Sequence, residues 1–296
     1  MLHPRVVFVL SCNYSGSHLL ARLLGAHPAC ADIGELRNLP KFRARPGPNA
    51  SGTEARYAVD PLFAGIESLP ATRWHGWLLE RIRAVDPAVC VLVDNSKRLD
   101  WVARFVGRDD LDARCVHLLR DPRALARRWQ GIFTTPAARR RARLRELRRQ
   151  WRRAPRMLRA PMTEIHGWRW LRENRAISTF LARHQPAAPV VTYEALVADP
   201  AACLAQLMPS LGLAYDARQL DADAAAPFGT HKPAWAGAGP ASALQADLRW
   251  QQELDAAAAQ AVIAPAALRD YAAALGYGFG PAGLQAQTTS HEETDR

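Results

Sequence analysis

Residues 5–35 read RVVFVLSCNYSGSHLLARLLGAHPACADIGE, and this stretch decides the fold of the chain. It begins with the apolar run 6–10, whose β-branched residues are typical of a buried parallel strand. A polar turn follows at 11–17, and leucines then recur at helical spacing at positions 19, 20, 23 and 24. A strand, a turn of small residues and a helix together direct free backbone N–H groups and the positive end of a helix dipole toward an anion. The stretch therefore predicts a site for a phosphorylated ligand.

Three later apolar runs are predicted to be buried strands, at 88–93, 114–119 and 189–192. The first two are each followed by a helical pattern, so we expect an α/β fold with a central parallel sheet flanked by helices. In such sheets, ligands bind beyond the carboxyl ends of the strands. We therefore expect three polar segments at those ends to converge on one site: 11–17, 94–97 and 120–123.

The composition is that of a globular protein, with 49% hydrophobic and 23% charged residues among 296. A net charge of +11 favours acidic ligands, but much of the excess lies in one segment, so it says little about the active site. The five cysteines include no C-x-x-C pair, which favours buried thiols in a reducing compartment. The first apolar run is too short for a signal peptide, and no run approaches a membrane span. These features predict a cytoplasmic protein.

We expect a single domain over 1–283, followed by a flexible polar tail at 284–296. An arginine-rich helical insertion is expected within it at 136–186, and a long surface loop at 38–61. Outside the strand–helix units, the apolar patterns predict helices at 137–159, 164–184, 201–208, 241–259 and 265–275.

The predicted helix at 137–159 has Glu146 as its single acidic residue and allows two interpretations. It could be a helix that binds nucleic acid or a membrane surface. Alternatively, it is a solvated insertion whose Leu144, Leu147 and Trp151 pack on the domain. Arginine is common throughout this chain, which favours the second interpretation.

The turn at 11–17 lacks the lysine of the common phosphate-binding loop, G-x-x-x-x-G-K-[ST]. It resembles instead the first signature of the sulfotransferases that use 3′-phosphoadenosine 5′-phosphosulfate (PAPS), which is approximately [RK]-S-G-[ST]-[ST]-x-L. The matching residues are Tyr14-Ser15-Gly16-Ser17-His18-Leu19, followed by His27-Pro28 and Gly34-Glu35. The family's basic loop residue is replaced here by Tyr14.

Three further segments are similar to sulfotransferase signatures and occur in the same order. They are VLVDNSK at 91–97, VHLLRDPR at 116–123 and VTYEALVADP at 191–200. In the family, the arginine that corresponds to Arg120 holds the 3′-phosphate, and a serine usually stands eight residues later, where this chain has Arg128. An arginine can also bind a phosphate, and through two hydrogen bonds.

The resemblance implies a P-loop-like sulfotransferase fold and in-line transfer of a sulfuryl group from PAPS to a hydroxyl or amine, without a metal. Backbone N–H groups and hydroxyls of the turn would hold the 5′-phosphosulfate. Tyr193 would meet the adenine or close the cleft, although a strand-end aromatic residue is also typical of a core. The residues implied in PAPS binding are Tyr14, Ser15, Gly16, Ser17, His18, Leu19, Arg120, Arg128, Tyr193 and Lys232.

The resemblance also implies the catalytic residues. Glu35 would be the general base, with His18 and His75 as alternatives, and Lys97 would stabilise the bridging oxygen or a sulfonate oxygen. The replacement of the basic loop residue by Tyr14 leaves three alternatives. Lys97 supplies the missing charge, Tyr14 and His18 donate hydrogen bonds instead, or catalysis has been lost.

The expected partner is a small-molecule or carbohydrate acceptor. A kinase would need a phosphate-loop lysine, which the turn lacks. Two other functions stay open. The chain could be an inactive relative that binds the nucleotide, or a nucleic-acid-binding protein that uses the face at 139–159. Nucleic acid is not the expected partner. The sequence determines neither the acceptor nor the oligomeric state.

Overall fold

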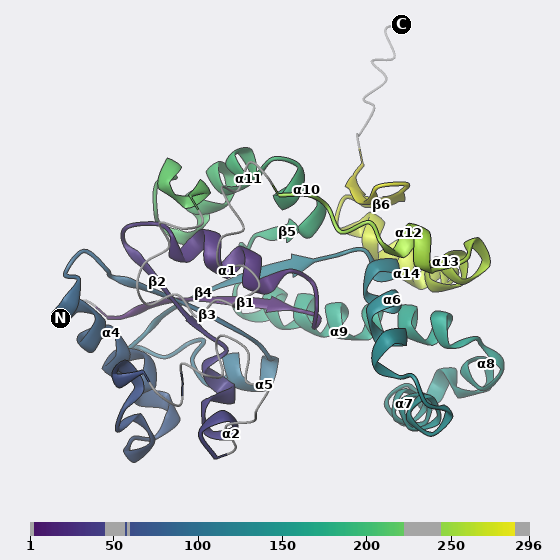
Figure 1. The fold of residues 1–296 in the computed structure, drawn as a ribbon, viewed down its shortest axis with the longest axis horizontal. Helices are drawn as coiled ribbons and strands as arrows, with labels where there is room; N and C mark the ends of the chain where they lie inside the picture. The colour runs from purple at the N-terminus through teal and green to yellow at the C-terminus, as the bar shows by residue number, and fades with distance from the viewer. Residues whose placement is uncertain (1–2, 45–56, 58–59, 222–243, 288–296) are drawn as a thin grey trace, which may run out of the picture. The chain divides into compact units, whose positions relative to one another are not determined.

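A computed structural model describes residues 3–44, 57, 60–221 and 244–287 of the chain (Figure 1). These residues form two compact units. The sheet unit comprises Met1–Leu119 and Ala176–Gln245, and the helical unit comprises Arg120–Arg175 and Ala246–Arg296. The long helix α9 (Met162–His184) contributes residues to both units.

The sheet unit is built on five parallel strands in the order β2-β3-β1-β4-β5. Their bounds are β1 (Arg5–Ser11), β2 (Cys30–Gly34), β3 (Val91–Lys97), β4 (Asp112–Leu119) and β5 (Val190–Thr192). The parallel sheet confirms the predicted α/β fold. The strand predicted at 88–93 begins later, at Val91, and continues through Lys97, so the segment expected to follow it is part of the strand.

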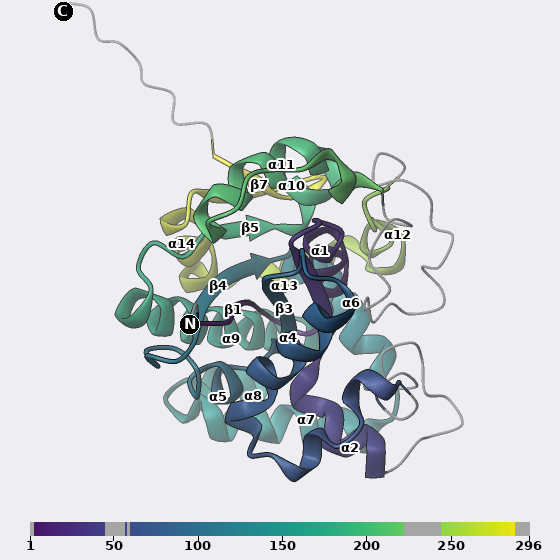
Figure 2. The same cartoon turned by 90° about the vertical axis from the view of Figure 1, so that its left-hand side faces the viewer.

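Side chains of β1 alternate between two cores, because successive residues of a strand point to opposite faces. Val7 and Val9 pack with α1 (Ser17–Gly25), α10 (Tyr193–Ala198) and α11 (Pro200–Leu207), which lie above the sheet in Figures 1 and 2. Phe8 packs on the opposite face with α4 (Trp74–Val85), α5 (Leu99–Val102) and the last part of α9. The sheet is therefore covered on both faces, as a parallel sheet requires.

Short helices surround the end of β2 and account for part of the segment predicted as a long loop at 38–61. The loop prediction is wrong for 39–44, which form α2 (Leu39–Ala44), and residues 45–56, 58 and 59 lie outside the described part. Tyr57 is fully buried and its hydroxyl donates to the carbonyl of Ile33 at 2.7 Å. The 3-10 helices of this unit are η1 (Leu36–Asn38), η2 (Pro61–Phe63), η3 (Ile66–Ser68), η4 (Ala71–Arg73), η6 (Met208–Leu211) and η7 (Ala217–Leu220).

The helical unit begins directly after β4. As the sequence predicts, Pro122 starts α6 (Pro122–Ile132) and the carboxylate of Asp121 caps it by accepting from the N–H of Arg123 at 2.7 Å. The elements that follow are α7 (Pro136–Arg149), η5 (Trp151–Arg153), α8 (Ala154–Arg159), α12 (Trp250–Glu253), α13 (Ala256–Ile263), α14 (Ala266–Ala274), β6 (Tyr277–Gly280) and β7 (Gly283–Ala286).

Two helix predictions are wrong in this unit. The helix expected at 137–159 is interrupted at Gln150, where α7 ends. Leu144 and Trp151, predicted to pack on the domain, are 42% and 69% exposed, whereas Leu147 is buried as expected. Of the helix expected at 241–259, residues 241–243 lie outside the described part and 244–249 are not helical. The rest is divided between α12 and α13, with Leu254 between them in an extended conformation.

The predicted tail also begins too early. Residues 283–286 form β7, which pairs with β6 in an antiparallel hairpin. Leu284 is only 1% exposed, so this part of the segment 284–296 is packed. Residues 288–296 lie outside the described part of the chain.

Candidate active site at the end of the parallel sheet

The turn between β1 and α1 has an unusual backbone. Gly16 is the N-cap of α1 with a φ of 90°, in the left-handed region that glycine adopts without strain. A Cβ built on Gly16 would lie 2.6 Å from Cδ2 of Tyr193, which begins α10. Both the backbone and the ring of Tyr193 therefore require glycine here. Tyr14 also has a positive φ, 74°, a conformation that costs a side-chain-bearing residue free energy.

Buried hydroxyls gather in this turn. Ser15 and Ser17 are 1% and 2% exposed, and Ser11 at the end of β1 is 6% exposed. None of the three hydroxyl oxygens has a hydrogen-bond partner among the described residues. A buried polar group left unpaired costs about 1 to 3 kcal/mol. No side-chain cap forms at the start of α1, so these hydroxyls and the first N–H groups of the helix are suited to an anion.

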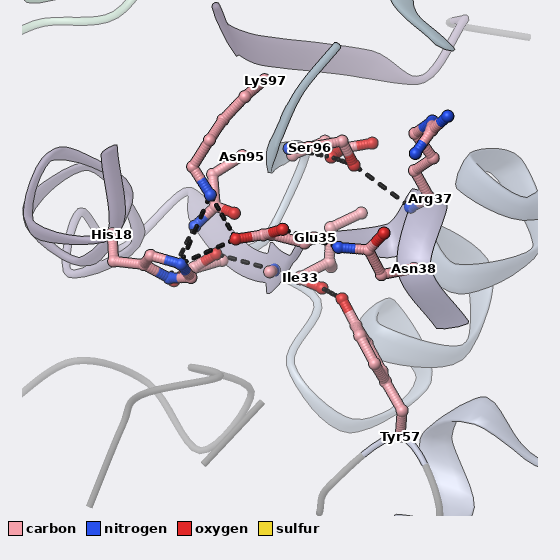
Figure 3. A network of polar contacts seen from close by, with 12 residues as sticks. His18, Ile33, Glu35, Arg37, Asn38, Tyr57, Asn95, Ser96 and Lys97 are labelled. Carbon is pink, nitrogen blue, oxygen red and sulfur yellow. Dashed lines mark hydrogen bonds and ion pairs between the residues drawn. The ribbon is translucent and has the colours of Figure 1, made fainter. Parts of the chain in front are cut away.

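Glu35, the first residue after β2, lies at the centre of a polar network (Figure 3). Its Oε1 accepts from Nε2 of His18 at 2.8 Å and from Nζ of Lys97, and its Oε2 accepts from Nδ2 of Asn38 at 2.7 Å. The side chains of His18, Lys97 and Glu35 are 17%, 5% and 23% exposed. The structure thus brings together the three residues expected to be catalytic, from α1, from the position just after β2, and from β3.

Asn95 orients the ring of His18. Nδ2 of Asn95 lies 3.2 Å from Nδ1 of His18, and an amide nitrogen can only donate. With the Asn95 amide assigned in this orientation, Nδ1 of His18 is the acceptor and the ring hydrogen on Nε2 is donated to Glu35. Neither Asn95 nor Asn38 is among the site residues predicted from the sequence. Asn95 lies inside the D-N-S-K segment, two residues before Lys97. Residues two apart on a strand lie on the same face, so this spacing could have indicated that Asn95 is near the site.

Glu35 is held as a carboxylate. Burial by itself raises the pKa of a carboxyl group, but the hydrogen bond from His18 and the charge and hydrogen bond of Lys97 outweigh it and lower the pKa of Glu35 to about 2. Lys97 has a φ of 65°, a strained value for a residue with a side chain. Strained residues of this kind cluster at functional sites, and here Lys97 is one of the residues that contact the carboxylate of Glu35.

A second, fully buried network supports the segment that carries Glu35. Asp94 accepts from Nε2 of His75 at 2.9 Å, from Nε1 of Trp101 at 2.8 Å, and from the N–H and Oγ of Ser96. Oγ of Ser96 in turn accepts from the N–H of Arg37 at 3.1 Å, which attaches the residues after Glu35 to β3. His75, an alternative base in the sequence analysis, is 0% exposed and belongs to this scaffold, so that prediction is wrong.

The remaining predicted ligands are distributed as follows. Arg120, in the helical unit, is 9% exposed and forms an ion pair with Asp247 at 3.2 Å. Arg128 is exposed on α6, and Leu19 packs at the edge of the core beneath α1. Lys232 lies outside the described residues. The convergence of Arg120 with the Ser15–Ser17 turn stays a prediction.

Comparison with known proteins places the chain in a family. Residues 4–217 match the sulfotransferase family, so the chain belongs to it. Two solved structures share the fold: the sulfotransferase domain from the Synechococcus PCC 7002 olefin synthase and the sulfotransferase domain from the curacin biosynthetic pathway. Their sequence identities are 18% and 19%, and their TM-scores are 0.54 and 0.53. The matches cover 92% and 93% of this chain, and 96% and 98% of those domains. No curated protein matches.

The family confirms the predicted resemblance and the sulfotransferase class. Among the described residues, no helix is long and apolar enough to cross a membrane, and no cluster of three or more histidine, cysteine, aspartate or glutamate side chains could hold a metal ion.

Proposed function

We propose that this chain transfers a sulfuryl group from PAPS to a hydroxyl or amine of a small-molecule or carbohydrate acceptor. One observation carries the proposal. The hydroxyls of Ser15 and Ser17 are buried at the amino end of α1 and have no hydrogen-bond partner in the described part of the chain. The next residue, His18, contacts the carboxylate of Glu35. An anion-binding turn next to an ionised carboxylate supplies both halves of a group-transfer site.

The turn would bind the phosphosulfate of PAPS, whose phosphate is the leaving group for the sulfuryl group. N–H groups from Gly16 to His18, with the hydroxyls of Ser15 and Ser17, would donate to its oxygens. The N–H of Ser15, expected from the sequence to take part, donates instead to the carbonyl of Cys12 at 3.3 Å. Lys97 would supply the positive charge that Tyr14 does not, by exchanging its contact with Glu35 for one with the phosphosulfate. Arg120 would hold the 3′-phosphate, which requires it to exchange its ion pair with Asp247.

In the reaction, the acceptor oxygen or nitrogen forms a bond to sulfur. The bond from sulfur to the bridging oxygen breaks, and its electron pair leaves with adenosine 3′,5′-bisphosphate. The acceptor proton goes to Glu35, which is ionised throughout the neutral pH range because its pKa is about 2. A carboxylate with so low a pKa is a weak base. It becomes stronger when Lys97 moves to the phosphosulfate, because a nearby positive charge lowers a carboxyl pKa.

Calorimetric titration with adenosine 3′,5′-bisphosphate, with ATP and AMP as comparisons, tests the donor. We expect preference for the 3′-phosphorylated nucleotide, lost in Arg120→Ala and kept in Arg127→Ala, a matched change on α6 where the arginine pairs with Glu253. Equal affinity for the bisphosphate and AMP would contradict PAPS use. Transfer of labelled sulfate to a panel of acceptors, abolished in Glu35→Gln, then tests the base.

The second candidate is an inactive relative that still binds the nucleotide. The observation in its favour is Tyr14, which replaces the family's basic loop residue and is 41% exposed. Nucleotide binding without transfer to any acceptor would support this alternative. Return of transfer in Tyr14→Lys would then show that the missing charge is the cause. The cytoplasmic location expected from the cysteine pattern stays a prediction.

A further inference from the structure

Nearly all the excess charge of the protein lies in residues 136–159, which form α7, η5 and α8 and are called the arginine arm below. The arm contains eleven arginines and one glutamate, Glu146. It therefore carries ten of the eleven excess positive charges, and the rest of the chain, with 28 basic and 27 acidic residues, is nearly neutral. A general bias toward arginine does not produce this contrast, because the arginines elsewhere are balanced by acidic residues.

The arginines of the arm are directed to solvent. All except the half-buried Arg143, whose guanidinium donates to three carbonyls at the end of α8, are exposed. The one carboxylate, Glu146, is buried and already paired with Arg172 at 2.9 Å. Several arginines make no hydrogen bond or ion pair with any described residue: Arg140, Arg141, Arg145, Arg148 and Arg159.

A pocket of about 350 Å³ lies at the break between α7 and α8. Its lining consists of Arg149, Gln150, Trp151, Arg152, Arg153, Leu171, Arg172 and Arg175. The guanidiniums of Arg152 and Arg153 lie 5.2 and 4.8 Å from the ring centroids of Trp151 and Trp168. Neither of these two arginines pairs with a carboxylate among the described residues, so the pocket is suited to an acidic group.

Large apolar side chains are exposed on the same arm. Leu144, Trp151 and Leu158 are 42%, 69% and 61% exposed. They are three of the six large hydrophobic residues that are exposed in the described part of the chain, although the arm is a small fraction of its length. Tryptophan and arginine are the residues most enriched among the energetically dominant contacts of protein interfaces.

These observations distinguish between partners. A small anion would fill the pocket but would leave most of α7, about 21 Å long for its fourteen residues, without a function. Nucleic acid would use the arginines and could stack on Trp151, but leucine side chains do not stack on bases. A membrane-surface helix needs an outward apolar face, whereas Ala142 and Leu147 of α7 are buried.

We propose that the arginine arm docks an acidic protein, whose carboxylates pair with the exposed arginines and whose apolar side chains cover Leu144, Trp151 and Leu158. Charge complementarity brings such partners together and aligns them, and the apolar contacts at the centre supply affinity. A carboxylate of the partner enters the pocket beside Arg152 and Arg153. This docking surface is separate in sequence from the residues proposed for sulfuryl transfer.

Binding to defined probes tests the proposal with the full-length protein. The probes are a helical peptide of glutamates with a stripe of leucines, a peptide of equal length and charge with serine in place of leucine, and single-stranded polyuridylate of matched charge. Trp151→Ser should weaken binding of the leucine peptide about 30-fold, as expected for a dominant interface residue. Arg145→Gln combined with Arg148→Gln should weaken it about 3- to 30-fold, without loss of an intramolecular contact.

The matched control is Arg83→Gln with Arg183→Gln, which removes two exposed arginines outside the arm and should leave binding unchanged. The proposal stands only if the leucine peptide binds more tightly than both other probes and loses affinity in both arm variants. Tighter binding of polyuridylate, unaffected by Leu158→Ser, would assign the arm to nucleic acid and overturn it. Equal binding of the two peptides would show that the exposed apolar residues play no part, and would also overturn it.

Discussion

Replacement of Lys97 by methionine should raise the pKa of Glu35. Methionine has a similar length and no charge, so it should fill the buried space that the lysine side chain occupies, with 5% exposure. Burial favours the protonated form of Glu35, while the hydrogen bond from His18 and the charge and hydrogen bond of Lys97 favour the ionised form. The variant removes both contributions of Lys97 and keeps that of His18, so the change in the pKa of Glu35 measures the effect of Lys97 alone.

The expected size follows from the geometry. Loss of an opposite charge in contact with a carboxylate raises its pKa by roughly 1 to 3, so the pKa of Glu35 should rise from about 2 to roughly 3 to 5. This corresponds to about 1.4 to 4 kcal/mol of stabilisation of the ionised form. Because the folded-state pKa of Glu35 lies below its ordinary value of 4.5, the stabilisation is fully present above pH 4.5 and is lost as the pH falls through about 2.

Two measurements check this expectation. The carboxyl ¹³C shift of Glu35, followed against pH, reports its pKa directly. Urea denaturation at several pH values reports the free energy of unfolding, and the native protein and Lys97→Met should differ most near neutral pH and converge as the pH approaches 2. Arg98→Met is the control, because Arg98 is 55% exposed and its ion pair with Asp100, at 3.5 Å, is screened by solvent.

A pKa of Glu35 that stays near 2 in Lys97→Met would refute the reasoning. The hydrogen bonds from His18 and Asn38 would then suffice to hold the carboxylate, and Lys97 would not control its basicity. The proposal that Glu35 becomes a stronger base when Lys97 moves to the phosphosulfate would also fail, because it depends on the same coupling.

Three further changes should affect stability, each measured by urea or thermal unfolding. Gly16→Ala should lower the free energy of unfolding by about 1 to 3 kcal/mol because of its positive φ, and further because the new Cβ clashes with Tyr193. Adding Tyr193→Ala should remove only the loss caused by the clash. A Gly16→Ala variant as stable as the native protein would contradict the argument from strain. Asp94→Asn leaves buried donors poorly paired and should cost about 2 to 5 kcal/mol, so an unchanged midpoint would rule out its supporting role. Glu146→Gln should lower the free energy of unfolding by about 3 to 5 kcal/mol, because it removes the buried carboxylate that pairs with Arg172. The same change at Glu173, whose side chain is more exposed, should lower it by less than about 1 kcal/mol.

The central strands could be predicted from the sequence because their residues are unambiguous. The run at 6–10 and the valine-rich end of the run at 88–93 are apolar and β-branched, and 114–119 contains four apolar residues around His117, as strands buried on both faces do. The strand β2, Cys-Ala-Asp-Ile-Gly at 30–34, was missed because it is short and contains an aspartate and a glycine. Its Asp32 is buried and accepts from the N–H of Gly34 at 2.8 Å, a local compensation that a hydrophobic pattern does not reveal.

The site was predicted in part. Glu35, Lys97 and His18 were named from a resemblance, and the structure brings them together, but their roles stay proposals. The supporting residues were missed because hydrogen bonding, not polarity alone, decides whether a polar residue is buried. The resemblance implies His75 as an alternative base, whereas its hydrogen bond to Asp94 holds it in the interior.

Glu35 and Lys97 are neighbours only through the pairing of β2 with β3, since 62 residues separate them along the chain. In an unfolded chain the two side chains would rarely meet, and this carboxyl group would titrate as it does in a short peptide. Its acidity is therefore a property of the assembled sheet. A single isotope label at this position would report, from within the proposed catalytic centre, what fraction of the molecules is native.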